Sequence, residues 1–167
     1  MSTSVLISYA TRAGSTREVA EAVSSTFREA GLWPEMLPMA QVDSFQGAAA
    51  VILGAPLYMG RFPREFHKFV VRHRRALAPL RPWLFVLGPT RNEPADFVAA
   101  RSQALKQLER YQWIHPAELQ IFGGRWDATR LPFPFTLLRR VPASDIRDWP
   151  AIHEWSLSVA NQIKPAA

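Results

Sequence analysis

The sequence predicts an α/β domain with one open parallel sheet and helices on both of its faces. Five short apolar runs that suit buried strands alternate with helical stretches along the 167 residues. Such alternation is typical of doubly wound sheets, in which a helix connects each strand to the next. Apolar residues make up 48% of the chain, which is enough for one well-buried core. No repeat or change in composition divides the chain, which indicates a single domain over 1–167.

The first predicted strand spans residues 4–9, and the first helix spans residues 15–30. The strand is largely apolar, as parallel strands buried on both faces are. The helix repeats apolar residues at helical spacing, and Gly31 suits its C-terminal cap. The apolar residues of this helix are Val19, Val23, Phe27 and Ala30.

The middle of the chain predicts two further strands and a second helix. Residues 33–38 contain prolines, which suit an edge strand, and residues 49–54 are typical of a buried strand. Pro63 suits the first residue of a helix that continues to Leu77. One face of this helix is apolar and the other is basic. The apolar face comprises Phe66, Phe69, Val70, His73 and Leu77.

The C-terminal half predicts two more strands and two more helices. Strands are expected at 83–88 and 117–123, and the helix between them starts near Pro94. Asp148 is an N-cap candidate for the last helix. The buried face of that helix is expected to carry Ile152, Trp155, Val159 and Ile163.

Residues 124–147, between the fifth strand and the last helix, form an unusually long connection. Connections of this length in a compact domain are usually functional or disordered, and this one is too apolar for simple disorder. Arginines stand beside its apolar residues, which favours a hydrophobic lid, a membrane-surface element or a partner contact. The apolar residues are Trp126, Leu131, Phe133, Phe135, Leu137 and Leu138.

A loop of small and hydroxyl residues, 11–16, joins the first strand to the first helix. In this arrangement the loop N–H groups and the helix N-terminus converge on one anion, and the helix dipole favours its charge. Gly14 allows a close backbone approach. The loop lacks the lysine of nucleoside triphosphatases and the glycines of dinucleotide-binding loops. We therefore expect a phosphate site here; the alternative is that Ser15 and Glu18 form only a capping box.

Two other loops are expected at the same end of the sheet. Ligands of doubly wound sheets bind at the carboxyl ends of the strands. Residues 55–62 follow the third strand, and residues 89–94 follow the fourth. Tyr58 and Met59 are able to lie against a flat heterocycle, and Gly60 permits close backbone approach.

Composition and charge exclude several functions. The chain has no cysteine, which excludes disulfides and thiolate chemistry, and its four histidines lack metal-ligand spacing. Segment 61–81 has a net charge of +6, which equals the net charge of the whole chain. The basic face of the helix in this segment is expected to face solvent, an anionic membrane or an acidic partner. No nucleic-acid motif accompanies this charge, so nucleic acid is not expected as a partner. No apolar span or signal peptide is visible, which predicts a cytoplasmic protein.

The loop sequences resemble those of a known family. Residues 11–16 after the first strand, together with residues 54–60 after the third, resemble the flavodoxin family of FMN-binding proteins. Within that family the chain is most similar to the menaquinone-dependent protoporphyrinogen oxidases, and the resemblance covers essentially the whole chain. The segments that carry this closer match are 9–18, 66–73, 112–113, 123–126 and the long connection before the last helix.

The resemblance implies a flavodoxin-like sheet of order 2-1-3-4-5, an insert at 124–147 and an FMN cofactor. The flavin would carry the redox chemistry, so no catalytic side chain and no metal are expected. The residues implied for the phosphate are Thr11, Arg12, Ala13, Gly14, Ser15 and Thr16. The residues implied beside the isoalloxazine ring are Pro56, Leu57, Tyr58, Met59, Gly60, Pro89, Thr90 and Arg91.

The resemblance also implies that the substrate is protoporphyrinogen IX and that electrons pass to a quinone. Propionate groups of the substrate need cationic partners, and Arg125 and Arg130 of the insert are the candidates, with Trp126 beside them. The basic helix face would hold the protein at the inner face of the cell membrane.

Two other interpretations stay open. One is a flavodoxin-type electron carrier or a quinone reductase without the porphyrinogen activity. The other is an interaction protein that has the fold without a flavin. The chain is basic and has Ser15 where electron-carrier flavodoxins, which are typically acidic, have asparagine, and its third loop offers no aromatic residue to stack on a flavin. The sequence does not indicate an oligomeric state.

Overall fold

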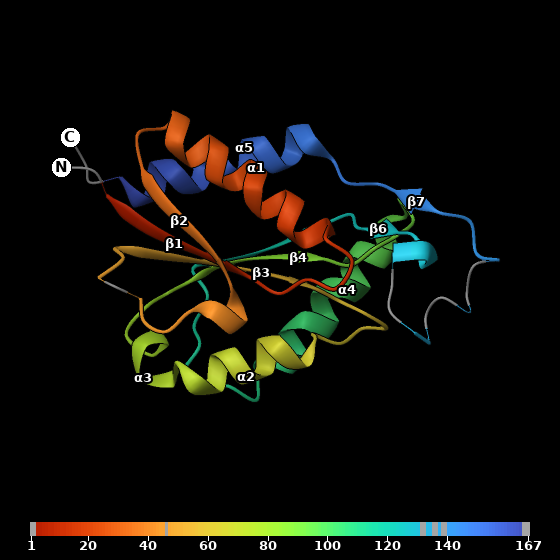
Figure 1. The fold of residues 1–167 in the computed structure, drawn as a ribbon, viewed down its shortest axis with the longest axis horizontal. Coiled ribbons are helices and arrows are strands. Elements are labelled where there is room, and N and C mark those ends of the chain that lie inside the picture. Colours follow the sequence, from red (N-terminus) through yellow and green to blue (C-terminus); the bar gives the residue numbers. More distant parts are fainter. Residues whose placement is uncertain (1–2, 46, 131–132, 135–136, 138–139, 165–167) are drawn as a thin grey trace.

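A five-stranded parallel sheet forms the centre of the computed structural model, which describes residues 3–45, 47–130, 133–134, 137 and 140–164. The strand order is β2-β1-β3-β4-β5, and every pair is parallel. This confirms the predicted sheet (Figure 1). The strands are β1 (Ser4–Tyr9), β2 (Trp33–Pro38), β3 (Ala50–Pro56), β4 (Trp83–Leu87) and β5 (Glu118–Phe122).

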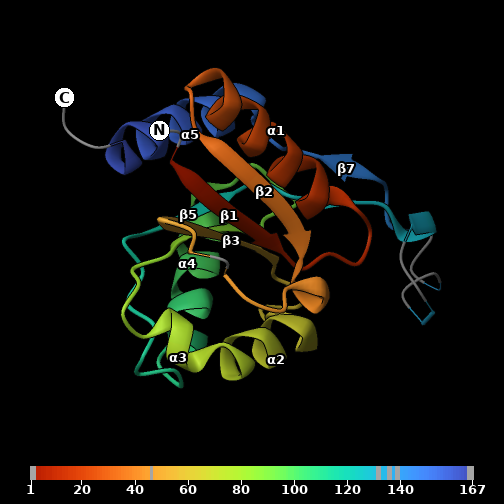
Figure 2. The same cartoon turned by 60° about the vertical axis from the view of Figure 1, so that its left-hand side comes forward.

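Helices cover both faces of the sheet, as the alternation predicts. Helices α1 and α5 lie together on one face, and α2, α3 and α4 lie on the other (Figures 1 and 2). Asp148 caps α5 as predicted, because its carboxylate accepts a hydrogen bond from the Ala151 N–H at 3.0 Å. The helices are α1 (Ser15–Glu29), α2 (Arg64–Arg72), α3 (Arg74–Leu77), α4 (Pro94–Leu108) and α5 (Trp149–Ile163).

Two apolar layers form the core, one on each face of the sheet. Alternate residues of the central strands point to opposite layers: Val5 and Ile7 pack under α1 and α5, whereas Leu6 and Leu53 face α2 and α4. This explains why these strands are continuously apolar rather than alternating. Each fully buried large apolar side chain contributes about 1.5–3 kcal/mol, so this core holds the loops at the strand ends on a rigid base.

The predicted helix 63–77 is interrupted at His73, which leaves helical geometry at φ −100°. The His73 ring packs against Phe45 and Phe69, and its Nε2 lies 3.1 Å from the Val42 carbonyl oxygen. A tertiary hydrogen bond of this kind is invisible to helical periodicity. Pro63 is the residue before α2 rather than its first residue, and β3 runs to Pro56, two residues beyond the predicted strand.

The insert 124–147 begins and ends in a two-stranded antiparallel ribbon that the sequence analysis did not predict. Strand β6 (Arg125–Trp126) pairs with β7 (Ser144–Asp145), and the ribbon extends from the carboxyl end of the sheet beyond α1 (Figure 1). Leu131, Phe135 and Leu138 lie outside the described residues. Phe133 and Leu137 have 78% and 71% of their surface exposed, so these two do not join the core.

Within the described ranges, none of the helices combines the length and the apolar character that crossing a bilayer requires.

Candidate functional site

The three loops singled out from the sequence meet at the carboxyl end of the sheet around one cavity of about 290 Å³. The start of the insert forms a fourth wall, which the sequence analysis assigned to substrate rather than to the same cavity. Leu87, Gly88 and Gly124 also line the cavity but were not predicted, although their positions at or just beyond the ends of strands β4 and β5 could have indicated them. The lining residues are Ser15, Pro56, Leu57, Tyr58, Met59, Leu87, Gly88, Thr90, Gly124, Arg125 and Trp126.

The loop 11–16 has the form expected of an anion cradle. Gly14 stands directly before α1 with φ +88°, a left-handed conformation that favours glycine, and its N–H donates to Thr11 Oγ1 at 3.0 Å. Among the residues that the structure describes, no side chain caps the N-terminus of α1. The capping-box alternative is therefore wrong, because the Glu18 carboxylate turns toward arginines of the insert instead. The first N–H groups of α1, which have no partners within the helix, stay available to a ligand.

Three observations fit a phosphate group in this cradle. Thr16 Oγ1 is buried and has no hydrogen-bond partner among the residues that the structure describes, so a donor is left for an incoming acceptor. Ser15 lines the cavity itself. A Cβ atom built on Gly14 would meet nothing closer than Arg125 Nη2 at 4.0 Å, so there is open space beside the loop. Of the other predicted phosphate residues, Arg12 places its guanidinium 5.1 Å from the Tyr58 ring centre and so connects the first loop to the second.

The second loop is a two-residue hairpin turn. Tyr58 and Arg61 exchange backbone hydrogen bonds of 2.9 and 3.0 Å, and both residues between them have positive φ, +48° at Met59 and +74° at Gly60. Helix α4 fixes this turn, because Gln107 donates to the Gly60 carbonyl oxygen at 2.8 Å and accepts from the Phe62 N–H at 2.9 Å. The turn holds Met59 at the rim of the cavity with 90% of its surface exposed.

Tyr58 is a neutral wall of the cavity. Burial raises the pKa of its phenol above the ordinary value of 10.0, although the Arg12 guanidinium partly offsets this. The phenol is therefore protonated at physiological pH. The sequence analysis proposed that Tyr58 could lie against a flat heterocycle, and its place in the cavity wall fits that proposal.

Residues of the third loop, 89–94, line two different pockets: the main cavity and a neighbouring groove. Thr90 lines both, whereas Pro89 and Arg91 line the neighbouring groove along α4 and not the main cavity. Gly60 of the second loop is likewise absent from the main cavity and lines that groove. Arg91 is 74% exposed and pairs with Asp96 at 3.0 Å, so the structure does not bring its charge into the main cavity.

The three candidates for substrate binding lie in different surroundings. Arg125 and Trp126 line the cavity, but Arg125 donates to Glu18 and to the Ala13 carbonyl oxygen and is only 13% exposed. Arg130 does not line the cavity; its guanidinium is 54% exposed and lies 3.4 Å from Asp127. Trp126 Nε1 is buried and has no partner within the described part of the chain. Of the two arginines, Arg130 is therefore the more accessible to a substrate carboxylate.

Comparisons with known proteins identify the family and the fold of the chain. A family model described as a flavodoxin domain matches residues 6–136. Protoporphyrinogen IX dehydrogenase [quinone] from Escherichia coli (strain K12) is 25% identical over 122 residues, which cover 71% of this chain and 67% of that protein.

Solved structures show the same fold at low sequence identity. An archaeal flavodoxin superposes with a TM-score of 0.61 at 13% identity, covering 97% of this chain and 99% of its own. A short-chain flavodoxin associated with a bacterial microcompartment gives 0.62 at 13% identity, covering 98% and 100%.

Proposed function

The chain belongs to the flavodoxin domain family, which indicates FMN as its cofactor, and from this premise we propose that it is an FMN-dependent protoporphyrinogen oxidase that passes electrons to a quinone. The coarser class, a flavin oxidoreductase or electron carrier, follows from the family itself. The single observation that carries the finer proposal is the E. coli relative, whose name states both a porphyrinogen substrate and a quinone.

We place the FMN phosphate on residues 11–16 and the ring in the cavity between the other loops. The uncapped N-terminus of α1 and the unpaired Thr16 hydroxyl support the phosphate position. Leu57, Tyr58 and Trp126 give the cavity mainly apolar walls, as flat heterocycles require. When bound, the flavin would accept and release the electrons.

The protein's own residues bind, orient and exclude water in this proposal. The polar side chains that line the cavity are Ser15, Tyr58, Thr90 and Arg125. Tyr58 stays protonated because burial raises its pKa, and Arg125 is already bonded to protein acceptors, so neither is suited to act as a general base. Met59 extends over the rim, where it can cover a bound ring.

The insert supports a large apolar substrate. Phe133 and Leu137 of the insert are exposed although they are apolar, and Arg130 of the same insert is 54% exposed. A porphyrinogen presents both an apolar macrocycle and propionate groups, so it can use both kinds of residue.

An anaerobic assay with protoporphyrinogen and a quinone acceptor tests the proposed function. We expect porphyrin fluorescence to appear only with the FMN-loaded protein. If no porphyrin forms although other electron donors reduce the flavin, the protein is better explained as an electron carrier.

A flavodoxin-type electron carrier is the alternative function within the same family. An archaeal flavodoxin and a short-chain flavodoxin superpose over nearly the full chain. These likenesses, at 13% identity, describe the fold and not the reaction. The same anaerobic assay therefore separates the two functions, because both require FMN and only one produces porphyrin.

Quinone access suggests a peripheral position at an anionic membrane. Arg64, Lys68 and Arg75 are exposed on α2 and α3, opposite the apolar face of these helices. Each cation near such a surface contributes about 1 kcal/mol, so replacing all three with glutamine should abolish sedimentation with anionic vesicles. Equal binding to neutral vesicles, or no binding by the unaltered protein, would refute this position.

A further inference from the structure

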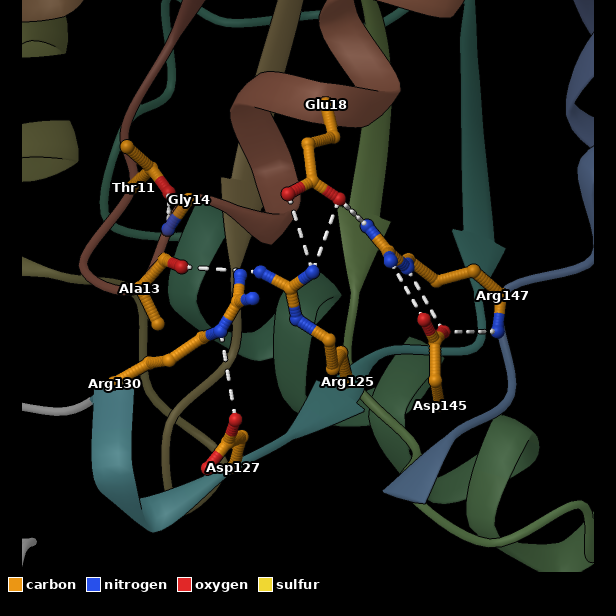
Figure 3. A network of polar contacts seen from close by, with 9 residues as sticks. All are labelled: Thr11, Ala13, Gly14, Glu18, Arg125, Asp127, Arg130, Asp145 and Arg147. Carbon is orange, nitrogen blue, oxygen red and sulfur yellow. Dashed lines mark hydrogen bonds and ion pairs between the residues drawn. The ribbon is translucent and has the colours of Figure 1, made fainter. Parts of the chain in front are cut away.

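The insert is tied back to the phosphate loop by a cluster of four charged side chains. Figure 3 shows Glu18 of α1 facing Arg125 of β6 and Arg147 near β7, with Asp145 on the far side of Arg147. The two carboxylates balance the two guanidinium groups, so the cluster as a whole is neutral. The proposed function names Arg125 only as a lining residue of the cavity and gives no role to the ion pairs of this cluster.

Glu18 receives hydrogen bonds from both arginines. Arg125 Nη1 lies 3.1 and 3.0 Å from the two carboxylate oxygens, and Arg147 Nη1 lies 2.5 Å from one of them. Arg125 Nη2 also donates to the Ala13 carbonyl oxygen at 3.1 Å. Arg125 thus bridges the carboxylate and the backbone of the phosphate loop itself, directly next to Gly14.

Arg147 is held rigidly for this role. Asp145 accepts from its Nε at 2.8 Å and from its Nη2 at 2.6 Å, a two-point contact that fixes the plane of the guanidinium. The Arg147 side chain is only 4% exposed, and its guanidinium stacks 4.8 Å from the Trp149 ring centre. A buried arginine in a fixed plane is pre-organised to meet Glu18.

The ribbon that carries these arginines is also bound to the third loop. The Gly124 N–H donates to the Pro89 carbonyl oxygen at 2.6 Å, and Ser144 Oγ donates to the Thr90 carbonyl oxygen at 3.1 Å. A Cβ at Gly123 would lie 2.3 Å from the Ile146 carbonyl oxygen, so only glycine allows the two ends of the insert to approach this closely. The ribbon therefore joins two of the three loops around the cavity.

The charge of Glu18 affects how strongly the neighbouring loop 11–16 can bind a phosphate. Glu18 lies in the first turn of α1, one turn from where the phosphate is placed. An uncompensated carboxylate there would repel a phosphate anion across a short, partly buried path. With both arginines in place the carboxylate is neutralised, and the positive end of the α1 dipole can act on the phosphate.

We propose that Arg125 and Arg147 are positioning residues that neutralise Glu18 and hold the phosphate loop, so that FMN affinity depends on the docked ribbon. This inference rests on the proposed position of the FMN phosphate at residues 11–16. In this account the insert serves the cofactor as well as any substrate.

A double-mutant cycle in FMN and riboflavin affinity tests the proposal, with flavin fluorescence as the readout. We expect Arg125→Met to weaken FMN binding about tenfold or more, a typical coupling within an ion-pair network, with little change for riboflavin, which lacks the phosphate. Glu18→Gln with Arg125→Met should bind FMN within about twofold of Glu18→Gln alone, because no carboxylate is then left to neutralise. If Arg125 were instead a direct phosphate ligand, the loss would be the same in both backgrounds, which would overturn the proposal.

Arg17→Met is the matched control, because it removes the same charge next to Glu18 from an exposed pair with Glu21. Arg17→Met should leave FMN affinity unchanged. If it weakened FMN binding as much as Arg125→Met does, the loss would reflect the net charge of the protein and not the neutralisation of Glu18, which would refute the proposal. If Arg125→Met does not fold, the double variant compared with Glu18→Gln still tests the proposal, because a further loss of FMN affinity in the double variant would overturn it.

The riboflavin series separates the inference from its premise. Equal FMN and riboflavin affinities in the unaltered protein would refute the phosphate position. If the unaltered protein clearly prefers FMN but the effects of Glu18→Gln and Arg125→Met on FMN affinity are additive, only the proposed role of the arginines is refuted. Hydrogen exchange supplies a structural readout: Glu18→Gln should speed exchange of the Ile146 amide, which pairs the ribbon ends at 3.1 Å. Unchanged exchange there would contradict docking through Glu18.

Discussion

At the scale of single residues, Gly14 is the position where backbone geometry and ligand binding coincide. Its φ of +88° is strained for any residue with a side chain, yet a Cβ there would have room. The sequence analysis identified this residue from the loop composition alone. It could not identify the partners of Glu18, because Arg125 and Arg147 lie more than a hundred residues away and meet it only through the ribbon.

Gly14→Val should therefore weaken both folding and FMN binding. We expect a loss of about 1–2 kcal/mol in unfolding free energy from the left-handed backbone, and a fall in FMN affinity because the loop N–H groups move. Denaturant unfolding and flavin titration measure the two effects.

Gly31→Val is the matched control, since Gly31 has φ +84° at the other end of α1 with nothing near its Cβ position. It should lose similar stability and keep its FMN affinity. Unchanged FMN affinity in the Gly14 variant would contradict the position of the cradle.

At the scale of elements, the ribbon β6–β7 adds a pH-dependent contact to α1. Burial raises the pKa of Glu18, but hydrogen bonds from Arg147 and Arg125 more than offset this, so the net pKa lies below its ordinary value of 4.5. The hydrogen bond from Arg147 lowers the pKa of Asp145 below its ordinary value of 3.8. Both carboxylates therefore bind fewer protons in the folded chain than in the unfolded chain.

The contribution of this contact should be complete above pH 4.5 and disappear as the pH falls through the folded-state pKa values. Between about pH 6 and pH 3, the unaltered protein should thus lose more unfolding free energy than Glu18→Gln, as urea titrations at each pH can measure. Glu21→Gln, which removes an exposed carboxylate from the same helix, should behave like the unaltered protein. Parallel curves for the unaltered protein and Glu18→Gln would contradict the contact.

The elements also show where sequence patterns are sufficient. Continuous apolar runs predicted β1, β3 and β4 because both of their faces are buried. The break between α2 and α3 was missed, because it depends on the His73 contact with the Val42 carbonyl oxygen. The ribbon was missed because two-residue strands have no periodicity to detect.

At the scale of the whole molecule, strand order decides which loops meet. In the order β2-β1-β3-β4-β5 the ends of β1, β3 and β4 are neighbours, so the loops at 11–16, 55–62 and 89–94 surround one space. The alternation of strands and helices predicted that these loops lie at the carboxyl end of the sheet, and the family resemblance implied the strand order that makes them neighbours. The contribution of the insert to the same cavity could not be predicted, because the pairing of two-residue strands that returns the insert to the sheet has no periodicity in the sequence.

The most direct test of the account is a titration of the flavin-free protein with FMN and with riboflavin. We expect one FMN per chain, bound at least about tenfold more tightly than riboflavin, because the cradle at 11–16 contributes charge-assisted hydrogen bonds to the phosphate. Failure to bind FMN, or equal affinity for the two flavins, would contradict the phosphate site on which the account rests.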